Sequence, residues 1–518
     1  MRARFVLPLV AALALPAVAC SDRAGAAADA HPDFDGDGRG DLVVPAVGET
    51  IAGAPGAGAV HVFYGTSSGI VTGGSQLWSQ DSDQIRNRTG TNDHFGGAWA
   101  AADFDRDGFD DLAIGVPGEL RGAGAIHVLY GAASGLGWQR NQLFWQNTTG
   151  VPGDAFDGDG FGAALAAGDF DKDGKADLAI GAPGDAAPNA ARGGTVTVLY
   201  GTAAGIGVAD AALLVQGVAD IVGLAEAGDE FGAAIAAGDT DGDGRIDLAI
   251  GAPGEDVGAT QNSGVVSMIY GTGQGLQGRN SLQLLPGNFG IPGYAEAFDE
   301  FGRSLAIGHF DRGGSADLVV GSPGEGVGAV PGAGALTVFP GSIDGLVLTE
   351  AVLLTQQSPG VPGALQGSTG FGSVLVRGDF DGDGRNDLVV GMPFFDAGPG
   401  RPSTGAIVTL YGGLDLFGGR AGTMITQDTA NVIDVAEALD FFGLALQPVD
   451  GNGDGRDGLW VGVPGEDIGT IVDAGAGHVF GGSASGLTPT STTLWSQNTA
   501  GIGDSAQTDD FFGGGTPG

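Results

Sequence analysis

A loop of alternating acidic residues recurs seven times along this chain, and its regular spacing constrains the fold more than any other feature. Self-similarity at one period identifies a repeat architecture in which each repeat is one structural unit. Successive loops start 70, 66, 70, 70, 70 and 71 residues apart, and no linker longer than a loop separates the repeats. Residues 33–518 are therefore expected to form one domain. The loops begin at Asp33, Asp103, Asp169, Asp239, His309, Asp379 and Asp450.

Each period contains four strand-like segments in a constant order, as the third copy shows. A run of small and apolar residues at 161–170 precedes the acidic loop at 169–178, and the next segment ends in LAIGAPG at 178–184. β-Branched and apolar residues follow at 194–201, and an edge segment such as 141–147 closes a period. Four short strands without a helical period indicate one four-stranded sheet per repeat. Seven such sheets predict an all-β, seven-bladed β-propeller.

The two ends of the chain predict how this ring closes. Only the weak segment 24–30 precedes the first loop, whereas residues 508–518 read TDDFFGGGTPG, the start of another first strand. We expect this C-terminal segment to complete the first blade. The alternative, in which residues 24–31 form that strand and the C-terminus packs nearby, stays open.

The acidic loop has the pattern D-x-D-x-D-G-x-x-D-L, with carboxylates at positions 1, 3, 5 and 9. A hard cation such as Ca²⁺ takes several oxygen ligands at ~2.3–2.6 Å, and position 7 would add a backbone carbonyl. Position 12, where an EF-hand needs glutamate, is a strand residue such as Ile114. The pattern therefore predicts a calcium site between two strands. The complete copies are Asp33, Asp35, Asp37 and Asp41; Asp103, Asp105, Asp107 and Asp111; Asp169, Asp171, Asp173 and Asp177; Asp239, Asp241, Asp243 and Asp247; and Asp379, Asp381, Asp383 and Asp387.

Two copies of the loop depart from this pattern. The fifth has His309 at position 1 and Gly313 at position 5, keeps only Asp311 and Asp317, and is expected to hold no metal. The seventh has Gly458 at position 9, with Asp457 one residue early, so a weak or distorted site is expected. Its candidate ligands are Asp450, Asn452 and Asp454.

The charge of the chain limits its partners. There are 62 acidic and 21 basic residues, for a formal net charge of −41. Nucleic acid and anionic membrane surfaces attract basic proteins, so neither is expected as a partner. Hydrophobic residues make up 42% of the chain, too many for a disordered acidic tail. Bound calcium would relieve the crowding of carboxylates and should contribute to folding.

The N-terminus resembles an export signal. Residues 1–19 have a positively charged start, an apolar stretch and a small-residue cleavage site. Cys20, the only cysteine, follows directly, as in a bacterial lipoprotein, although Ala17 stands where leucine is usual. Lipidation of Cys20 stays open. With residues 20–32 as a short linker, we expect an exported protein at the cell surface, in the periplasm or secreted.

The residues around the loop resemble a known repeat. Phe161-Gly162 before the loop and Gly181-Ala182-Pro183 after it, repeated at 231–232 and 251–253, resemble the FG-GAP repeat of integrin α-subunit propellers. The first repeat departs, with Val44-Pro45 in place of Gly-Ala-Pro. The resemblance implies calcium on one face of a seven-bladed propeller and partner binding on the opposite face. We expect no counterpart here of the integrin legs, the inserted ligand-binding domain or the membrane helix, so integrin-type signalling is not expected to carry over.

Two sets of acidic residues fall on that opposite face. In one interpretation each side chain caps its own turn. In the other they form an acidic ring at the mouth of the central channel, which attracts a cation or a basic ligand. The first set lies two residues before the phenylalanine of FG: Asp93, Asp159, Asp229, Asp299, Asp440 and Asp510. The second follows the second strand: Glu119, Asp185, Glu255, Glu325 and Glu466.

Three further patterns are interpreted as structural. Arg39-Gly40-Asp41 spells the adhesion tripeptide RGD, but Asp41 is a position-9 ligand. GTSSG at 65–69 matches the G-x-S-x-G nucleophile motif without the strand–turn–helix that the motif needs. Three histidines share one repeat-equivalent strand position and are interpreted as surface residues: His61, His127 and His478. No catalytic constellation is found, so no enzyme activity is expected.

The sequence as a whole predicts an exported, calcium-binding, integrin-α-like propeller from a bacterium. We expect a monomer that serves as a binding or adhesion module for a protein or glycan. Two alternatives stay open: a structural scaffold of the cell envelope, and a hydrolase or lyase with its site at the mouth of the channel.

Overall fold

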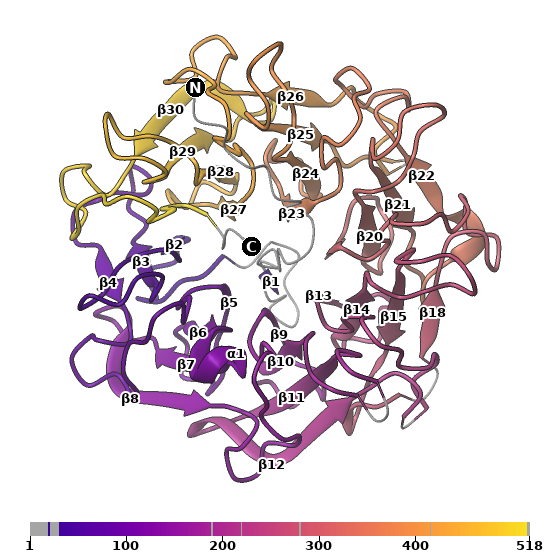
Figure 1. The fold of residues 1–518 in the computed structure, drawn as a ribbon, viewed down its shortest axis with the longest axis horizontal. Coiled ribbons are helices and arrows are strands. Elements are labelled where there is room, and N and C mark those ends of the chain that lie inside the picture. Colours follow the sequence, from indigo (N-terminus) through magenta and orange to yellow (C-terminus); the bar gives the residue numbers. More distant parts are fainter. Residues whose placement is uncertain are drawn as a thin grey trace.

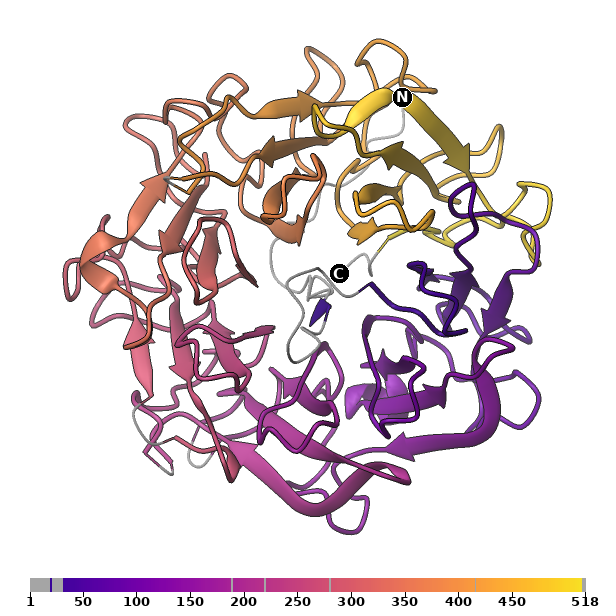
Figure 2. The same ribbon diagram turned by 180° about the vertical axis from the view of Figure 1, so that it is seen from behind.

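Seven β-sheets stand around a central axis (Figure 1). The structure, a computed structural model, describes residues 19–20, 31–187, 190–218, 220–278, 281–414 and 416–514. The sheets follow one another in chain order, with the first strand of a blade near the centre and the fourth at the rim, as the view from behind also shows (Figure 2). The predicted seven-bladed β-propeller is confirmed.

The strands fall into blades as the repeat predicts. The first blade has β2 (Leu42–Ala46), β3 (Ala59–Phe63) and β4 (Gln76–Trp78). The second has β5 (Ala98–Ala102), β6 (Asp111–Val116), β7 (Ala125–Tyr130) and β8 (Gly137–Phe144). The third has β9 (Ala164–Gly168), β10 (Asp177–Ala182), β11 (Thr195–Thr202) and β12 (Gly205–Leu214). The fourth has β13 (Ala234–Gly238), β14 (Asp247–Ala252), β15 (Val265–Ile269) and β18 (Leu282–Leu284), with a small hairpin of β16 (Gly271–Thr272) and β17 (Gly275–Leu276).

The remaining blades repeat this plan. The fifth has β19 (Ser304–Gly308), β20 (Asp317–Ser322), β21 (Ala335–Phe339) and β22 (Val352–Leu354). The sixth has β23 (Val374–Gly378), β24 (Asp387–Met392), β25 (Ala406–Leu410) and β26 (Thr423–Ile425). The seventh has β27 (Leu446–Val449), β28 (Gly458–Val463), β29 (Ala476–Gly481) and β30 (Thr488–Trp495). Beside the blades lie α1 (Glu119–Gly122), the 3-10 turn η1 (Leu348–Glu350) and β1 (Ala19–Cys20), which pairs in parallel with β5. None of the helices in the described residues has the length and apolarity needed to cross a membrane.

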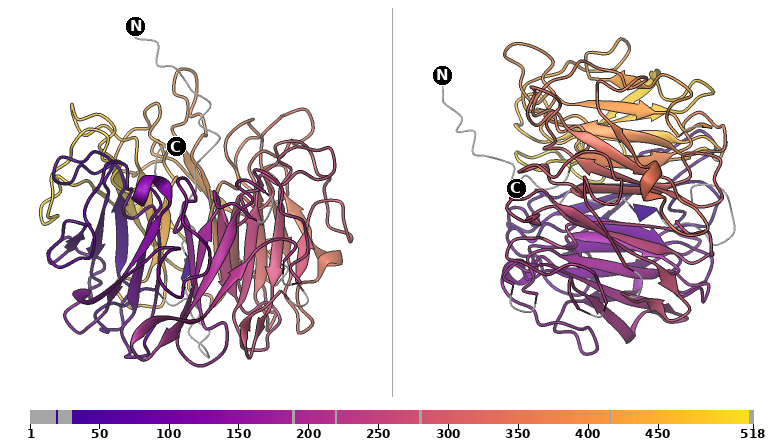
Figure 3. Two further views of the ribbon diagram at one scale, coloured as in Figure 1. Left: turned by 60° about the horizontal axis from the view of Figure 1, so that its bottom comes forward. Right: turned by 90° about the vertical axis from the view of Figure 1, so that its right-hand side faces the viewer.

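The loops gather on two faces of the ring, because the strands of each blade are antiparallel and run between the faces (Figure 3). One face carries the acidic loops between first and second strands and is called the acidic-loop face. The other carries the loops that lead from a fourth strand to the next FG dipeptide and from a second strand to a third. It is called the FG face.

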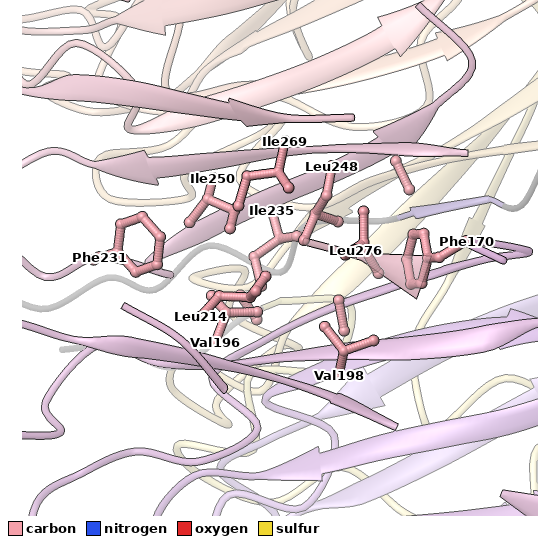
Figure 4. Packing of buried hydrophobic residues seen from close by; sticks show 14 of the residues in the cluster. Phe170, Val196, Val198, Leu214, Phe231, Ile235, Leu248, Ile250, Ile269 and Leu276 are labelled. Carbon is pink, nitrogen blue, oxygen red and sulfur yellow. The ribbon is translucent and has the colours of Figure 1, made fainter. Parts of the chain in front are cut away.

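The core lies between neighbouring blades. Inner strands such as β10 are buried along their whole length, which explains their continuous apolar sequence. In the cluster of Figure 4, Phe170 and Val198 of the third blade pack with Ile235, Leu248 and Ile250 of the fourth. Each blade therefore buries its faces against its neighbours, and an open ring would expose two of them.

The glycines of the repeat bring neighbouring blades together. Gly232, in the FG dipeptide of the fourth blade, has φ of +91° and approaches Gly181 at the end of β10 in the third. A Cβ on Gly181 would lie 2.1 Å from the Gly232 carbonyl oxygen, closer than any side chain allows. The motif glycines are thus required by the approach of two backbones.

The ring closes between the seventh and first blades, which lie side by side in yellow and indigo in Figure 1. Phe512 donates its backbone N–H to Ala474 O at 3.1 Å, and Gly513 donates to Pro45 O at 2.9 Å. The FG dipeptides of the second, third, fourth, fifth and seventh blades make the same two kinds of contact. Residues 24–30, the alternative closing strand, lie outside the described residues.

Candidate metal sites and the FG face

The acidic loops bring their carboxylates together. In the third blade, one oxygen each of Asp169, Asp171 and Asp177 lies within 4.8 Å of the other two. The turn is closed at position 6 by Gly174, whose φ is +87° and whose N–H donates to Asp169 at 2.8 Å. A set of carboxylate oxygens alone fits a hard cation such as Ca²⁺. Positions 1, 3 and 9 cluster in the same way at Asp103, Asp105 and Asp111; Asp239, Asp241 and Asp247; and Asp379, Asp381 and Asp387. In the first loop the clustered carboxylates are those of positions 1, 3 and 5, Asp33, Asp35 and Asp37.

The position-9 aspartate is built into the blade. Both oxygens of Asp177 accept backbone N–H groups at 2.9 Å, one from Phe170 inside the loop and one from Gly201 at the end of the third strand. Burial is the main cause that raises the pKa of Asp177 to about 8, and the nearby Asp171 carboxylate adds to it. These bonds fix the oxygens in the loop before any cation arrives.

In four of the five complete loops, position 5 has a charge partner at position 7 of the same loop. Asp37 pairs with Arg39 at position 7, with Oδ2 and Nη1 2.5 Å apart. Asp243 pairs with Arg245 in the same way at 2.6 Å. These partners are half-buried or nearly exposed, so each pair stabilises the loop only weakly. A cation would thus compete with a basic side chain for the carboxylate at position 5.

Two arginines that the sequence did not single out reach the position-3 ligands. The guanidinium of Arg420 contacts Asp381 at 2.8 Å and lies 3.6 Å from the centre of the Tyr411 ring. Arg140 contacts Asp105 in the second blade and lies over Tyr130. Their distances along the chain from the loops differ, so no regular spacing reveals them. Both add positive charge beside a ligand, which sets the second and sixth loops apart.

The fifth and seventh loops show what remains without a full ligand set. Asp317 still accepts N–H groups from Phe310 and Gly341, so position 9 has a structural role of its own. In the seventh loop Asp457 occupies position 8 and accepts the N–H of Asp379 in the preceding blade at 2.7 Å. It is therefore a contact between blades and not a displaced position-9 ligand. Asp110 and Asn386 make the equivalent contact.

The RGD tripeptide is not available to a receptor. Asp41 has no exposed surface and accepts N–H groups from Phe34 and Gly65, while Arg39 is paired with Asp37. This burial agrees with the interpretation that the RGD tripeptide is a product of the repeat.

The aspartates before each FG dipeptide cap their own turns. Asp159 Oδ2 accepts the N–H of Phe156, three residues earlier, at 2.5 Å, and the other five repeat this bond. All six side chains are buried. The first interpretation holds for this set, and these residues do not form an acidic ring that a basic ligand could reach.

Acids after the second strand accept a hydrogen bond, here called the clasp, from a glutamine of the preceding blade. Gln146 at the rim of the second blade donates Nε2 to Asp185 Oδ2 of the third at 2.7 Å. Four other junctions repeat this contact: Gln80 with Glu119, Gln216 with Glu255, Gln427 with Glu466, and Gln497 with Glu49. Glu49 was missed in the sequence. At the four junctions other than the ring closure, the glutamine stands 39 residues before its acid. This constant spacing could have identified the pairs from the sequence.

The three histidines are buried, so their interpretation as surface residues is wrong. His61, His127 and His478 have no exposed surface, and burial lowers the pKa of His127 to about 3 and of the other two to about 4. The third strand of a blade is covered on both sides by neighbouring blades. His61 and His478 lie against the phenylalanines Phe512 and Phe442.

Comparison with known proteins agrees with this geometry. Four segments, residues 95–129, 161–199, 231–267 and 371–410, match the model of the FG-GAP repeat. This chain carries FG-GAP repeats. It is 34% identical over 174 residues to the mouse (Mus musculus) phosphatidylinositol-glycan-specific phospholipase D, a match that covers 33% of this chain and 19% of the relative.

Integrins also match the FG-GAP region. Integrin alpha-PS5 of Drosophila melanogaster is 33% identical over 174 residues, which cover 33% of this chain and 16% of the integrin. The match therefore spans about a fifth or less of these two relatives. Among solved structures, the Dos1 propeller aligns with 82% of this chain and 74% of that chain, at 11% identity and a TM-score of 0.38.

Proposed function

We propose that this FG-GAP protein is an exported, calcium-stabilised binding module that takes a protein or glycan partner on its FG face. The observation that carries the proposal is where the large apolar side chains are exposed. Among the described residues fourteen are exposed, and ten of them lie in loops of the FG face. Exposed apolar patches of soluble proteins mark interaction sites more often than chance. The ten are Leu120, Phe156, Val218, Val222, Leu224, Phe289, Tyr294, Phe298, Ile433 and Val435.

One loop stands out within this set. Phe289, Tyr294 and Phe298, exposed by 67%, 80% and 58%, all come from the loop between the fourth and fifth blades. This junction also has Pro286 where other junctions have the clasping glutamine. Exposed aromatic rings supply the large contact area of interface hot spots and can stack on sugar rings. We infer that this loop contributes the principal contacts with the partner.

Calcium has the supporting role in this proposal. The five complete loops lie on the acidic-loop face, away from the exposed aromatic residues, so their ions would order the blades without touching the partner. Signal cleavage and a lipid anchor on Cys20 belong to the same proposal; residues 1–18 and the Cys20 side chain lie outside what the structure describes.

A pull-down tests the binding function. Immobilised residues 21–518 are exposed to cell-envelope protein and glycan fractions in calcium and then in chelator. We expect retention of a defined protein or glycan that is reduced at least tenfold in the triple variant Phe289→Ser, Tyr294→Ser and Phe298→Ser. Ile343→Ser, which removes an apolar side chain of similar exposure from the acidic-loop face, should bind normally. Equal retention by both variants would contradict the assignment of the face.

Hydrolysis stays the second candidate function, because relatives that share the repeats are named phospholipase D. Incubating the purified protein with a glycosylated phosphatidylinositol separates the two. Turnover that persists in the triple aromatic variant would favour an enzyme, whereas binding without turnover supports the module.

A further inference from the structure

The glutamines that clasp neighbouring blades each leave one oxygen unused. At five junctions of the FG face the amide Nε2 donates to an acid, while Oε1 contacts no hydrogen-bond donor among the described residues. The side chains are at most 2% exposed, so bulk water does not satisfy this oxygen. A buried polar atom without a partner is rare and calls for a bound group. The five are Gln80, Gln146, Gln216, Gln427 and Gln497.

A second carboxylate lies beside each clasped acid. At all five junctions the glycine before the clasped acid donates its backbone N–H to the carbonyl oxygen of the aspartate before FG, as Gly118 does to Asp93 at 3.0 Å and Gly48 to Asp510 at 3.1 Å. Each junction thus combines two buried carboxyl groups with an unused amide oxygen.

The cluster is most complete where the ring closes. Glu49 of the first blade accepts Gln497 Nε2 at 2.5 Å and Gln507 Nε2 at 3.0 Å. Two oxygens there have no donor among the described residues, Gln497 Oε1 and Asp510 Oδ1. Glu49, Gln497 and Asp510 are each 1% exposed or less. The neighbouring charges that act most on Glu49 are those of Asp510 and Asp504, both negative.

Buried carboxylates that repel one another need a counter-charge. Oxygen ligands select hard cations, and two carboxylates are neutralised by two positive charges. We propose that Glu49, Gln497 and Asp510 hold a hard divalent cation that joins the last blade to the first. The four related clusters are further sites of the same kind. These sites are separate from the acidic loops, because Asp41 and Glu49 stand at opposite ends of β2.

Two junctions provide controls within the chain. Between the fourth and fifth blades, Pro286 replaces the glutamine that would face Glu325. Between the fifth and sixth, Gln356 is kept and its Oε1 also has no donor among the described residues, but Phe395 replaces the acid and the Gln356 Nε2 lies 3.9 Å from Met392 Sδ. Neither junction has the full set of ligands, so neither is expected to bind a cation.

Crystals of the mature chain in Sr²⁺, a hard divalent ion located by its anomalous scattering, test the proposal directly. We expect peaks beside Glu49, Gln497 and Asp510 and at the four related clusters, but none at the Pro286 and Phe395 junctions. Peaks in the acidic loops report separately on those sites. Peaks confined to the acidic loops, with none at any glutamine cluster, would overturn the proposal.

A variant pair tests it in solution. Glu49→Gln keeps the shape of the side chain and should remove one Ca²⁺ from the stoichiometry measured by native mass spectrometry. It should also reduce the calcium-induced rise in Tm while raising the Tm in chelator, since a buried charge is lost. Glu325→Gln is the matched control and should retain every ion. If Glu49 only accepts hydrogen bonds, Glu49→Gln lowers the Tm in chelator and keeps the wild-type number of ions, which would refute a cation at this site.

Discussion

At the scale of single residues, the position-9 aspartate combines two roles that the sequence presents as one. Asp177 joins the loop to the third strand through two backbone hydrogen bonds, and it is also a candidate ligand. Asp317, in the incomplete fifth loop, keeps the first role alone. A substitution at position 9 should therefore lower the stability even without calcium, whereas a substitution at position 3 should mainly lower the calcium affinity.

Substituting these aspartates tests that separation. Asp177→Asn turns an NH₂ group toward one of two backbone N–H donors, so it should cost ~1–3 kcal/mol of unfolding free energy even in chelator. Asp171→Asn should leave the stability in chelator nearly unchanged and weaken calcium binding. Urea unfolding with and without calcium measures both. Asp317→Asn serves as the control, since it should destabilise the protein without any effect on calcium. If Asp177→Asn is silent in chelator, position 9 is a ligand only.

The buried histidines give a pH dependence of known sign. The pKa of His127 is lowered to about 3 in the folded protein from an unfolded value near 6.5, so only the unfolded chain takes up a proton as the pH falls below 6.5. Stability is then lost toward acid at up to ~1.4 kcal/mol per pH unit for each such histidine. His127→Val, which copies Val408 of the sixth blade, should reduce the loss between pH 7 and 4.5 in chelator. Equal losses in both proteins would mean that His127 is protonated when folded.

At the scale of elements, the strands and acidic loops were predictable because both repeat along the chain. The order of apolar and small residues within one period predicts the strands, and the spacing of carboxylates within ten residues predicts a cation-binding loop. Contacts between blades were not predictable in this way. The hydrogen bond from Gln146 to Asp185 joins residues of two different blades. The third strand that carries His127 is buried by a neighbouring blade, and the sequence of that strand alone does not reveal the burial. Arg140 and Arg420 follow no repeat at all.

The clasp can be tested at two junctions that differ in one partner. Gln146→Leu removes a hydrogen bond to a buried carboxylate and should cost ~1.5–3 kcal/mol of unfolding free energy. Gln356→Leu removes the same side chain where Phe395 replaces the acid, and it should cost little. Thermal or urea unfolding of both variants in calcium gives the comparison. Similar costs at the two junctions would show that packing, and not the carboxylate, accounts for the effect.

At the scale of the whole molecule, the ring depends on its last residues. Phe512 is fully buried against the first blade and Trp460 of the seventh, and a Cβ on Gly462 would lie 1.6 Å from the Gly513 carbonyl oxygen. The closing segment thus reproduces the close approach of an FG glycine to a second-strand glycine that occurs at the five junctions from the second blade to the seventh.

Removing one closing side chain should weaken all blades together. Phe512→Ala is expected to cost ~3–5 kcal/mol, as at a fully buried core position, because the cavity opens between the first and last blades. The neighbouring Phe511, which is partly exposed, provides the control, and Phe511→Ala should cost less than half as much. A silent Phe512→Ala in urea unfolding would mean that the C-terminal segment does not hold the ring closed.

The central claim, that the acidic loops bind calcium, is tested most directly by counting ions in position-3 variants by native mass spectrometry. Asp35→Ala, Asp105→Ala, Asp171→Ala, Asp241→Ala and Asp381→Ala should each remove one Ca²⁺ from the wild-type number. Asp311→Ala, in the loop that lacks the full ligand set, should remove none. A wild-type protein with the same mass and the same Tm in calcium and in chelator would contradict the account.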